Sequence, residues 1–386
     1  MRYLCTTAGQ ELLVAAQETG NAGLSAQEAL RTHFPVAMCR AALGLVQLRD
    51  RAKDKFARAE RMFFDREGYE MATRTEVAQY RAWRLREYGD ILDLCCGIGG
   101  DLLFLGQGAR VTAVDAERRR LEMARLNCAV HELSTVRFIA ADARALRPRG
   151  DAIFFDPARR SGGARRRRSA DYEPPLAFVN ELRHHVADVA VKVSPAIPEE
   201  EIPSDCEVEF VSSSGQCREA VLYFGRLATT ARRATILPAR HTIASDGVGP
   251  APVGPPGAYV YDPDPAVVRS HLIDELARQL DGWKLDEQIA YLSSDTLVQT
   301  PFARAYRVLE TLPFQVKKLR RRLREQGFFP QQVKRRRFPL EPIEVERKLG
   351  IDSGDIPVAL LLTRLADKTT CLICQIIGNS TDSMSA

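Results

Sequence analysis

One segment constrains the fold of this 386-residue chain more than any other: Ile91 to Asp101, which reads Ile-Leu-Asp-Leu-Cys-Cys-Gly-Ile-Gly-Gly-Asp. Strand-forming residues, with one Asp among them, lead into a glycine-rich turn, and the apolar residues 102–105 can then pack a helix onto a sheet. Strand, glycine turn and helix in this order are typical of α/β folds that hold a nucleotide-like cofactor at the carboxyl end of the sheet. Gly97 and Gly99 have no Cβ, so the backbone can turn tightly there and lie against a ligand.

Strand-like and helix-like segments alternate from residue 86 to residue 228. Such alternation predicts a mostly parallel sheet with right-handed crossovers. The last two strands are close in sequence, as in an antiparallel hairpin. We therefore expect an α/β fold with a seven-stranded, Rossmann-like core. Its strands are expected at residues 91–94, 110–114, 136–140, 152–155, 188–193, 207–212 and 219–224.

The rest of the chain divides by composition, and a chain of this length is expected to form two or three domains. Residues 1–85 carry apolar side chains at helical spacing, which predicts an N-terminal helical region. Residues 227–256 are rich in Pro, Gly, Ala and Thr, which predicts a linker or an extended loop. Residues 257–378 mix strand-like and helix-like segments and predict a C-terminal α+β domain.

Three acidic residues follow the glycine turn, each at the end of a predicted strand. Asp115 lies 18 residues after Gly97 (115 minus 97), near the spacing at which an acid reaches the ribose hydroxyls of a bound adenosine. Asp142 ends the third strand and could accept a hydrogen bond from an adenine amino group, and Asp156 ends the fourth. A single such Asp is more often a turn former or a helix cap. Three at successive strand ends favour a cofactor site.

Because of the glycine turn and the three acids at strand ends, residues 86–224 resemble the class I S-adenosylmethionine-dependent methyltransferases. A dinucleotide-binding dehydrogenase is the rival, but Leu102 stands where its third glycine would be. The resemblance implies S-adenosyl-L-methionine as cofactor, with the two glycines beside its methionine part, Asp115 on the ribose and Asp142 near the adenine. The cofactor-binding candidates are Asp93, Cys96, Gly97, Gly99, Asp115 and Asp142. The catalytic candidates, in the fourth motif, are Asp156, Pro157 and Arg159.

Within that superfamily the core is similar to the trimethylguanosine synthase type of RNA guanine-N2 methyltransferase. Residues 95–101 resemble the first motif of that type, and residues 66–78 resemble the segment leading into its core. Its fourth motif ends in Pro-Pro-Trp, whereas this chain has Pro157-Ala158-Arg159, and an Arg plane can also stack on a base. Residues 259–337 resemble the THUMP-like domain of bacterial methyltransferases. The genuine THUMP domain binds tRNA, which implies RNA binding here by analogy.

Basic residues are concentrated in two places, although the net charge is only +5. Six arginines lie between residues 159 and 168, and ten Lys or Arg residues lie between 317 and 337, against the single acid Glu325. Two separate concentrations, one beside the expected active site, favour a polyanionic partner such as RNA. The RNA-binding candidates are Arg165, Arg166, Lys317, Lys318, Lys334, Arg335, Arg336 and Arg337.

Three functions are compatible with these features. The first is a methyltransferase acting on a base of RNA (tRNA or rRNA) or of DNA, at an exocyclic or ring nitrogen. The second is a small-molecule or protein methyltransferase, which leaves the basic clusters unexplained. The third is a non-catalytic nucleic-acid-binding protein with a relict cofactor fold. Methylation of a pyrimidine carbon would need a cysteine nucleophile, and the fifth strand instead ends in Lys192-Val193-Ser194-Pro195.

The remaining composition indicates a cytoplasmic protein. There is no run of ~20 apolar residues that could span a bilayer and no secretory signal segment at residues 1–7. The nine cysteines are odd in number and lie mostly in apolar stretches, as reduced thiols do. Cys371 and Cys374 form a CxxC without a second pair or a His cluster, so we expect no metal site. The sequence does not indicate an oligomeric state.

Overall fold

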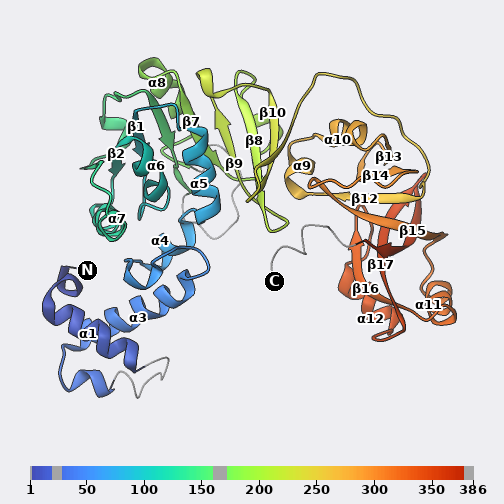
Figure 1. Ribbon diagram of the computed structural model, residues 1–386, viewed down its shortest axis with the longest axis horizontal. Helices are drawn as coiled ribbons and strands as arrows, with labels where there is room; N and C mark the ends of the chain where they lie inside the picture. Colours follow the sequence, from blue (N-terminus) through green and yellow to red (C-terminus); the bar gives the residue numbers. More distant parts are fainter. Residues whose placement is uncertain (1, 20–27, 160–171, 378–386) are drawn as a thin grey trace. The chain divides into compact units, whose positions relative to one another are not determined.

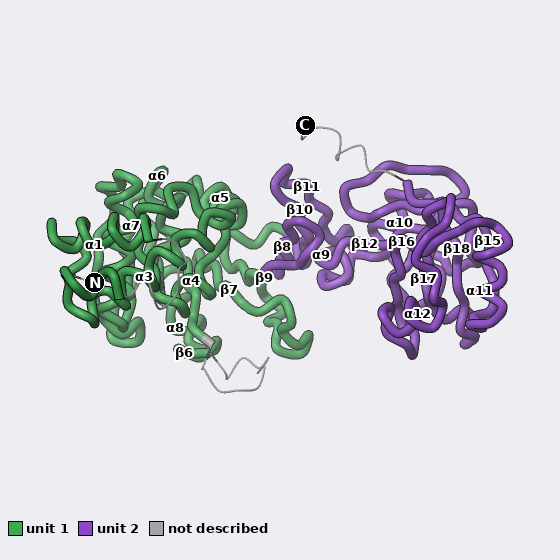
Figure 2. The backbone as a smooth tube through the Cα atoms, turned by 90° about the horizontal axis from the view of Figure 1, so that it is seen from below, with its two compact units in different colours: residues 1–206, 221–229 green, residues 207–220, 230–386 purple. Residues whose placement is uncertain are grey.

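The computed structural model describes residues 2–19, 28–159 and 172–377 (Figure 1). The chain folds into two compact units, which Figure 2 shows in two colours. The first contains residues 1–206 and 221–229, and the second contains residues 207–220 and 230–386.

Helices form the N-terminal part of the first unit. Thr6 caps the first of them by accepting a hydrogen bond from the Gly9 N–H at 3.2 Å, and Asp65 caps another through the Gly68 N–H at 2.7 Å. A Cβ on Gly68 would lie 2.5 Å from the Ile98 side chain, so this helix packs directly against the glycine turn. These helices are α1 (Thr7–Glu18), α3 (Val36–Ala52), α4 (Arg66–Met71) and α5 (Thr75–Arg84).

The first sheet has nine strands in the order β11-β10-β8-β9-β7-β4-β1-β2-β3. The seven predicted strands are all present as β1 (Asp90–Leu94), β2 (Arg110–Asp115), β3 (Val136–Ala140), β4 (Ala152–Phe155), β7 (Val189–Val193), β8 (Glu207–Ser213) and β9 (Gln216–Tyr223). β1 pairs in parallel with β2 on one side and β4 on the other, so the chain changes direction at β1. Ligands of open α/β sheets bind at such a switch point, beyond the carboxyl ends of the strands. The predicted α/β, Rossmann-like core is confirmed.

The sheet has two more strands than the sequence predicts, because part of the expected linker is folded. β10 (Arg232–Leu237) pairs in parallel with β8, and β11 (His241–Ala244) pairs antiparallel with β10. The prediction of a linker over residues 227–256 was therefore wrong over these residues. β10 is held by polar pairs, since Arg233 contacts the buried Glu207 at 2.7 Å and Thr235 donates to Glu209 at 2.5 Å. An apolar pattern does not reveal a strand of this kind.

Apolar packing holds the helices of the first unit to its sheet. One continuous cluster joins Leu12 and Leu43 in the N-terminal helices to Ile91 in β1 and Phe154 in β4, and each of these side chains is buried. The glycine turn is therefore fixed between the sheet and the helical region. The helices that follow the turn are α6 (Leu102–Gly108), α7 (Arg118–Val130) and α8 (Phe178–His185).

The second unit contains a separate seven-stranded sheet in the order β13-β14-β12-β15-β18-β17-β16. Its strands are β12 (Tyr259–Pro263), β13 (Trp283–Asp286), β14 (Ile289–Ser294), β15 (Ala303–Pro313), β16 (Phe328–Arg335), β17 (Ile356–Leu365) and β18 (Lys368–Ile376). Its helices are α9 (Pro265–Arg269), α10 (Ile273–Gln279), α11 (Val316–Glu325) and α12 (Pro342–Leu349). Mixed helices and strands of this kind agree with the predicted α+β character.

Candidate functional site

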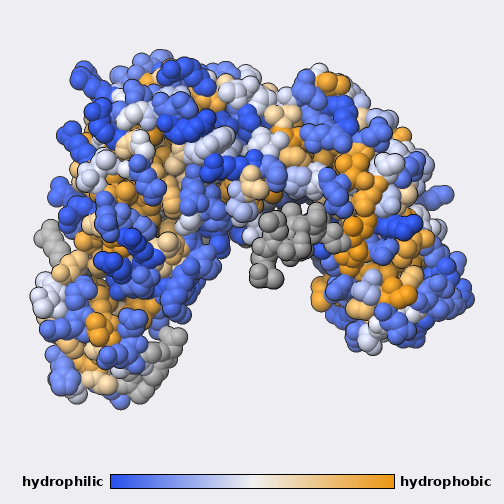
Figure 3. Space-filling model, viewed as in Figure 1, coloured by the Kyte–Doolittle hydropathy of each residue, from blue (hydrophilic) through white to orange (hydrophobic). Residues whose placement is uncertain are grey.

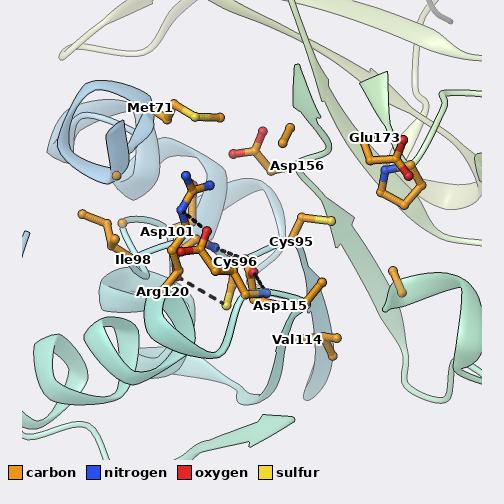
Figure 4. Close-up of a pocket in the computed structure, with 18 of the residues that line it drawn as sticks. Met71, Cys95, Cys96, Ile98, Asp101, Val114, Asp115, Arg120, Asp156 and Glu173 are labelled. Carbon is orange, nitrogen blue, oxygen red and sulfur yellow. Dashed lines mark hydrogen bonds and ion pairs between the residues drawn. The ribbon is translucent and has the colours of Figure 1, made fainter. Parts of the chain in front are cut away.

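A cavity of about 230 Å³ lies at the carboxyl ends of β1 and β2 (Figure 4). It is enclosed by the glycine turn, by the ends of neighbouring strands and by the segment before α5. The lining includes residues 71–73, 95–98, 114–117 and 141–144, together with Gly68, Gly100, Asp101, Arg120, Asp156, Ala158, Glu173 and Pro174. The sheet topology therefore brings three of the predicted acids, Asp115, Asp142 and Asp156, to one cavity.

The two glycines of the turn have different physical roles. Gly97 has φ +57°, and a Cβ built on it would meet no atom within 4 Å, so its open side belongs to the cavity. Gly99 has φ +86°, and a Cβ there would lie 3.1 Å from the Ala124 Cβ on α7. Gly97 thus leaves room for a ligand, whereas Gly99 lets the turn pack closely on a helix.

Asp115 is fixed in the cavity wall by two backbone N–H groups. Its Oδ2 accepts from the Gly97 N–H at 2.9 Å and its Oδ1 from the Glu117 N–H at 2.8 Å. Burial raises the pKa of Asp115, although these two hydrogen bonds act in the opposite direction. The carboxylate therefore joins the end of β2 to the glycine turn. Figure 4 shows it beside Cys96, whose N–H donates to the Val114 carbonyl at 3.1 Å.

Asp142 lies at the rim and is paired with a neighbouring arginine. Its Oδ1 accepts from the Arg144 N–H at 2.9 Å, and the Arg144 guanidinium contacts its Oδ2 at 2.7 Å. The hydrogen bond from this side chain lowers the pKa of Asp142. Arg144 also contacts Glu173 at 2.9 Å, so the rim consists of one cation between two carboxylates.

Asp93 is a buried carboxylate behind the glycine turn. It is 1% exposed, does not line the cavity, and neither of its oxygens has a hydrogen-bond partner among the residues that the structure describes. Burial, together with Asp101 and Asp156 nearby, raises the pKa of Asp93 well above its ordinary value. An unpartnered buried carboxyl group is costly, so its presence here needs a reason.

A chain of polar contacts, which the sequence did not predict, joins the glycine turn to Asp156. The Arg81 guanidinium contacts Asp101 at 2.7 Å, and the Thr73 hydroxyl donates to the same carboxylate at 2.6 Å. Lys192 then donates to the Thr73 oxygen at 3.0 Å and to Asp156 Oδ2 at 2.8 Å. Burial alone would raise the pKa of Asp101, but Arg81 and Lys192 hold it below its ordinary value. Asp156 is thus held from the far side of β4.

The segment after Asp156 forms a short ribbon. β5 (Ala158–Arg159) pairs antiparallel with β6 (Tyr172–Glu173), and the Tyr172 hydroxyl accepts from the Ser194 N–H at 2.7 Å. Pro157 therefore begins a ribbon beside the cavity. The structure does not describe the side chain of Arg159, and the predicted RNA contacts Arg165 and Arg166 lie outside the described residues.

The predicted RNA contacts of the second unit fall into two groups. Lys317 and Lys318 are exposed on α11 and have no ion pair among the described residues. The others are paired: Lys334 and Arg336 contact Asp262 at 2.6 and 2.7 Å, Arg335 contacts Glu341, and Arg337 lies 4.0 Å from Asp286. The run that is continuous in sequence is therefore not one free cationic surface.

The structure also bears on membranes and metals. None of the helices in the described ranges is both long and apolar enough to cross a membrane. Across the same ranges, no group of three or more His, Cys, Asp or Glu side chains is placed to hold a metal ion. Cys371 and Cys374 on β18 are free thiols in two different apolar clusters, so the CxxC pair is separated by the strand.

Family models match parts of this chain, and two relatives match most of it. A methyltransferase domain matches residues 91–156, a THUMP domain-like family matches residues 303–375, and a domain of unknown function (DUF8688) matches residues 1–52. Two proteins of Mycobacterium tuberculosis (strains CDC 1551 / Oshkosh and ATCC 25618 / H37Rv) are each 36% identical over 327 residues, which cover 81% of this chain and 88% of theirs. Both are named uncharacterized S-adenosylmethionine-dependent methyltransferases. This chain belongs to that family.

The methyltransferase is therefore an enzyme whose cofactor is S-adenosyl-L-methionine, as the motifs predicted. The predicted THUMP-like domain is also confirmed. A crystal structure assigned as a methyltransferase of Porphyromonas gingivalis W83 is similar to it, with TM-score 0.80 and 21% identity over 96% of this chain and 99% of that one. At this identity the likeness concerns the fold alone. The resemblance to the trimethylguanosine synthase type stays a prediction.

Proposed function

We propose that this methyltransferase acts on a nitrogen of an RNA base, in tRNA or rRNA. The observation that carries the proposal is Asp156 at the cavity, followed by Pro157 and with one carboxylate oxygen bonded to Lys192. The bound cofactor supplies an electrophilic methyl group on a sulfonium ion. The protein then has to orient the acceptor rather than form a covalent bond with it.

The cavity fits the cofactor through residues of this chain. Gly97 leaves open space beside the turn, which suits the methionine part. Asp115 already accepts one N–H at each oxygen, and a carboxylate has further acceptor capacity for the ribose hydroxyls. Asp142 stands at the rim, where the adenine would lie. Asp93 is buried and unpartnered behind the turn, and its raised pKa favours the protonated form without a ligand. A cofactor that carries a sulfonium and an ammonium group would favour its ionised form.

Asp156 is proposed to bind the acceptor group. Its Oδ2 is bonded to Lys192, which leaves Oδ1 to accept a hydrogen bond from the exocyclic amine of a base. That contact would turn the nitrogen lone pair toward the methyl group. Pro157 shapes the turn that follows, and Arg159 is proposed to stack on the base in place of the Trp of the trimethylguanosine synthase type.

RNA is the proposed substrate because of the THUMP-like match and the basic residues of the second unit. Figure 3 shows hydrophilic residues over α11, where Lys317 and Lys318 are exposed. The alternative, a small-molecule or protein substrate, would give these cations no function. The predicted RNA contacts at Lys334 to Arg337 and at Arg165 and Arg166 remain part of the proposal.

The test is transfer of a labelled methyl group from the cofactor to RNA taken from cells that lack this gene. We expect the wild-type protein to label that RNA and the Asp156→Ala variant to lose transfer while binding the cofactor within a few-fold. The matched control is Asp205→Ala, at an exposed carboxylate that pairs with Arg183, and it should leave both properties unchanged. Labelling of a protein or small-molecule fraction instead of RNA would favour the alternative substrate.

A further inference from the structure

A cluster of cations gathers at one end of the second sheet. In the pairing of β12 with β15, Asp262 lies directly opposite Arg304, so both side chains are on the same face. Tyr306, two residues further along β15, shares this face and is buried in the apolar cluster beneath it. This face of the sheet therefore has an apolar cluster around Tyr306 and charged side chains at Asp262 and Arg304.

Two cations from the end of β16 and just beyond it, at the edge of the sheet, contact the Asp262 carboxylate. Lys334 Nζ contacts Asp262 Oδ2 at 2.6 Å, and the Arg336 guanidinium contacts Oδ1 at 2.7 Å. Lys334 Nζ also lies 5.8 Å from the Tyr306 ring centre, and the Arg336 guanidinium lies 5.2 Å from that of Tyr291. The sheet thus curves until its edge strand contacts β12.

The charges in this cluster do not balance. Lys334 and Arg336 share the one carboxylate of Asp262, and Arg304, opposite Asp262 on β15, has no ion pair among the described residues. The cations are partly withdrawn from water, with the Arg336 side chain 23% and the Lys334 side chain 35% exposed. Uncompensated charge in such a place is costly unless a counter-ion is bound.

Donors in the cluster are also unused. The Arg304 Nε and the Tyr291 hydroxyl are buried and have no hydrogen-bond partner among the described residues. The contrast is with α11, where Arg322 is paired with Glu310 at 2.7 Å and needs no further anion. An anion with several acceptor oxygens would satisfy what Asp262 alone does not.

We infer that Arg304, Lys334 and Arg336 form a phosphate-binding site, in which Asp262 holds Lys334 and Arg336 in place. A guanidinium presents paired N–H donors that match phosphate oxygens, and two guanidiniums with one ammonium can surround such a group. For its ligand, a phosphate of RNA, the inference rests on the proposed function. Asp262 is then a fixed counter-ion that spaces the three cations.

The test compares Arg304→Gln with Arg307→Gln in the full-length protein. Arg307 is on the same strand, faces the opposite side, is exposed, and has no ion pair among the described residues. The first probe is inorganic pyrophosphate, whose binding is measured as a rise in the thermal unfolding temperature. The second is a labelled 12-nucleotide RNA with either a 5′-phosphate or a 5′-hydroxyl, whose binding is measured by fluorescence anisotropy at several salt concentrations.

The wild type and Arg307→Gln should be stabilised by pyrophosphate and should bind RNA alike. Arg304→Gln should lose that stabilisation, bind RNA about tenfold more weakly, and show a salt slope smaller by about 0.7. Arg304→Lys keeps the positive charge and loses the paired N–H donors of the guanidinium. Its RNA affinity and its stabilisation by pyrophosphate should lie between those of the wild type and Arg304→Gln. This intermediate result would show that the loss in Arg304→Gln does not come from misfolding. A loss confined to the 5′-phosphorylated RNA assigns the site to a terminal phosphate, and a loss with both RNAs assigns it to the backbone.

Two further outcomes separate this inference from the proposed function. Pyrophosphate could raise the unfolding temperature of the wild type but not of Arg304→Gln, while neither the wild type nor any variant binds RNA. In that case the phosphate site is supported and the RNA proposal fails. If Arg304→Gln behaves like Arg307→Gln with both probes, the phosphate site is excluded.

Discussion

Asp115 connects the end of β2 to the glycine turn, and this makes it the most direct probe of cofactor binding. Asp115→Ala should weaken binding of S-adenosyl-L-methionine by about 1–3 kcal/mol, because the ribose hydroxyls lose an acceptor and the Gly97 N–H loses its partner. Calorimetric titration of the free enzyme measures this. Asp90→Ala, at the start of β1 and away from the cavity, is the control. Equal affinity of wild type and Asp115→Ala would remove Asp115 from the cofactor site.

Lys192 is proposed as a positioning residue for Asp156. Lys192→Met should lower the rate of methyl transfer about 10²-fold, because the carboxylate loses the hydrogen bond that orients it. Cofactor affinity should stay within a few-fold, since Lys192 is not part of the glycine turn. Lys192→Arg should restore part of the rate. A Lys192→Met variant with wild-type turnover would show that Asp156 does not need this partner.

Asp93 gives a prediction about pH, with a defined sign. Its pKa in the folded protein lies well above the value of about 3.9 in an unfolded chain, because it is buried. The folded state therefore holds a proton that the unfolded state releases, and the stability that this proton provides is lost as pH rises through the folded pKa. Asp93→Asn cannot ionise. Without cofactor it should unfold at a higher temperature than wild type at about pH 8, and the difference should shrink toward about pH 4.

The same substitution should weaken cofactor binding, because the positively charged cofactor favours the ionised form of Asp93 and the amide cannot ionise. Thermal unfolding across this pH range, with and without S-adenosyl-L-methionine, measures both effects. A difference in unfolding temperature between wild type and Asp93→Asn that is the same at every pH in this range would contradict the prediction. That result would mean that Asp93 is ionised in the folded protein over the whole range.

At the scale of elements, α11 offers a cationic face that can be removed without breaking ion pairs. Lys317→Gln, Lys318→Gln and Arg324→Gln together should weaken RNA binding and flatten its salt dependence by about 0.7–0.9 for each phosphate that is no longer neutralised. The folding stability should change little, because these exposed side chains have no ion pair among the described residues. Arg322→Gln on the same helix is the control, since it breaks the pair with Glu310 instead. Unchanged RNA affinity in the triple variant would exclude this face.

The strands that the sequence predicted and the strands that it missed differ in the kind of contact that holds them in the sheet. β1 and β4 are apolar runs followed by a turn, and the sequence located them within one residue. β10 contains Arg233 and Thr235, whose partners Glu207 and Glu209 are distant in sequence, so no local pattern indicated it. The site divides in the same way. Acids at strand ends were predictable because the carboxyl ends of parallel strands converge.

The polar chain to Asp156 was not predictable in detail. Arg81 and Thr73 precede the first strand and reach Asp101 only through tertiary packing. The only signal was that Thr73 lies in residues 66–78, which resemble the segment leading into the core of the trimethylguanosine synthase type. In the folded protein this segment places the Thr73 hydroxyl between Asp101 and Lys192, and only the structure shows that role.

At the scale of the whole molecule, one enzyme joins a cofactor domain to a domain of THUMP-like type. The central proposal is that the methyl group is transferred to a nitrogen of RNA. The most direct measurement is mass spectrometry of nucleosides from total tRNA and rRNA of three strains: wild type, a deletion of this gene, and the deletion complemented with Asp156→Ala. We expect an N-methylated nucleoside that is present in the wild type and missing from the other two. Identical nucleoside profiles in all three strains would contradict the proposal.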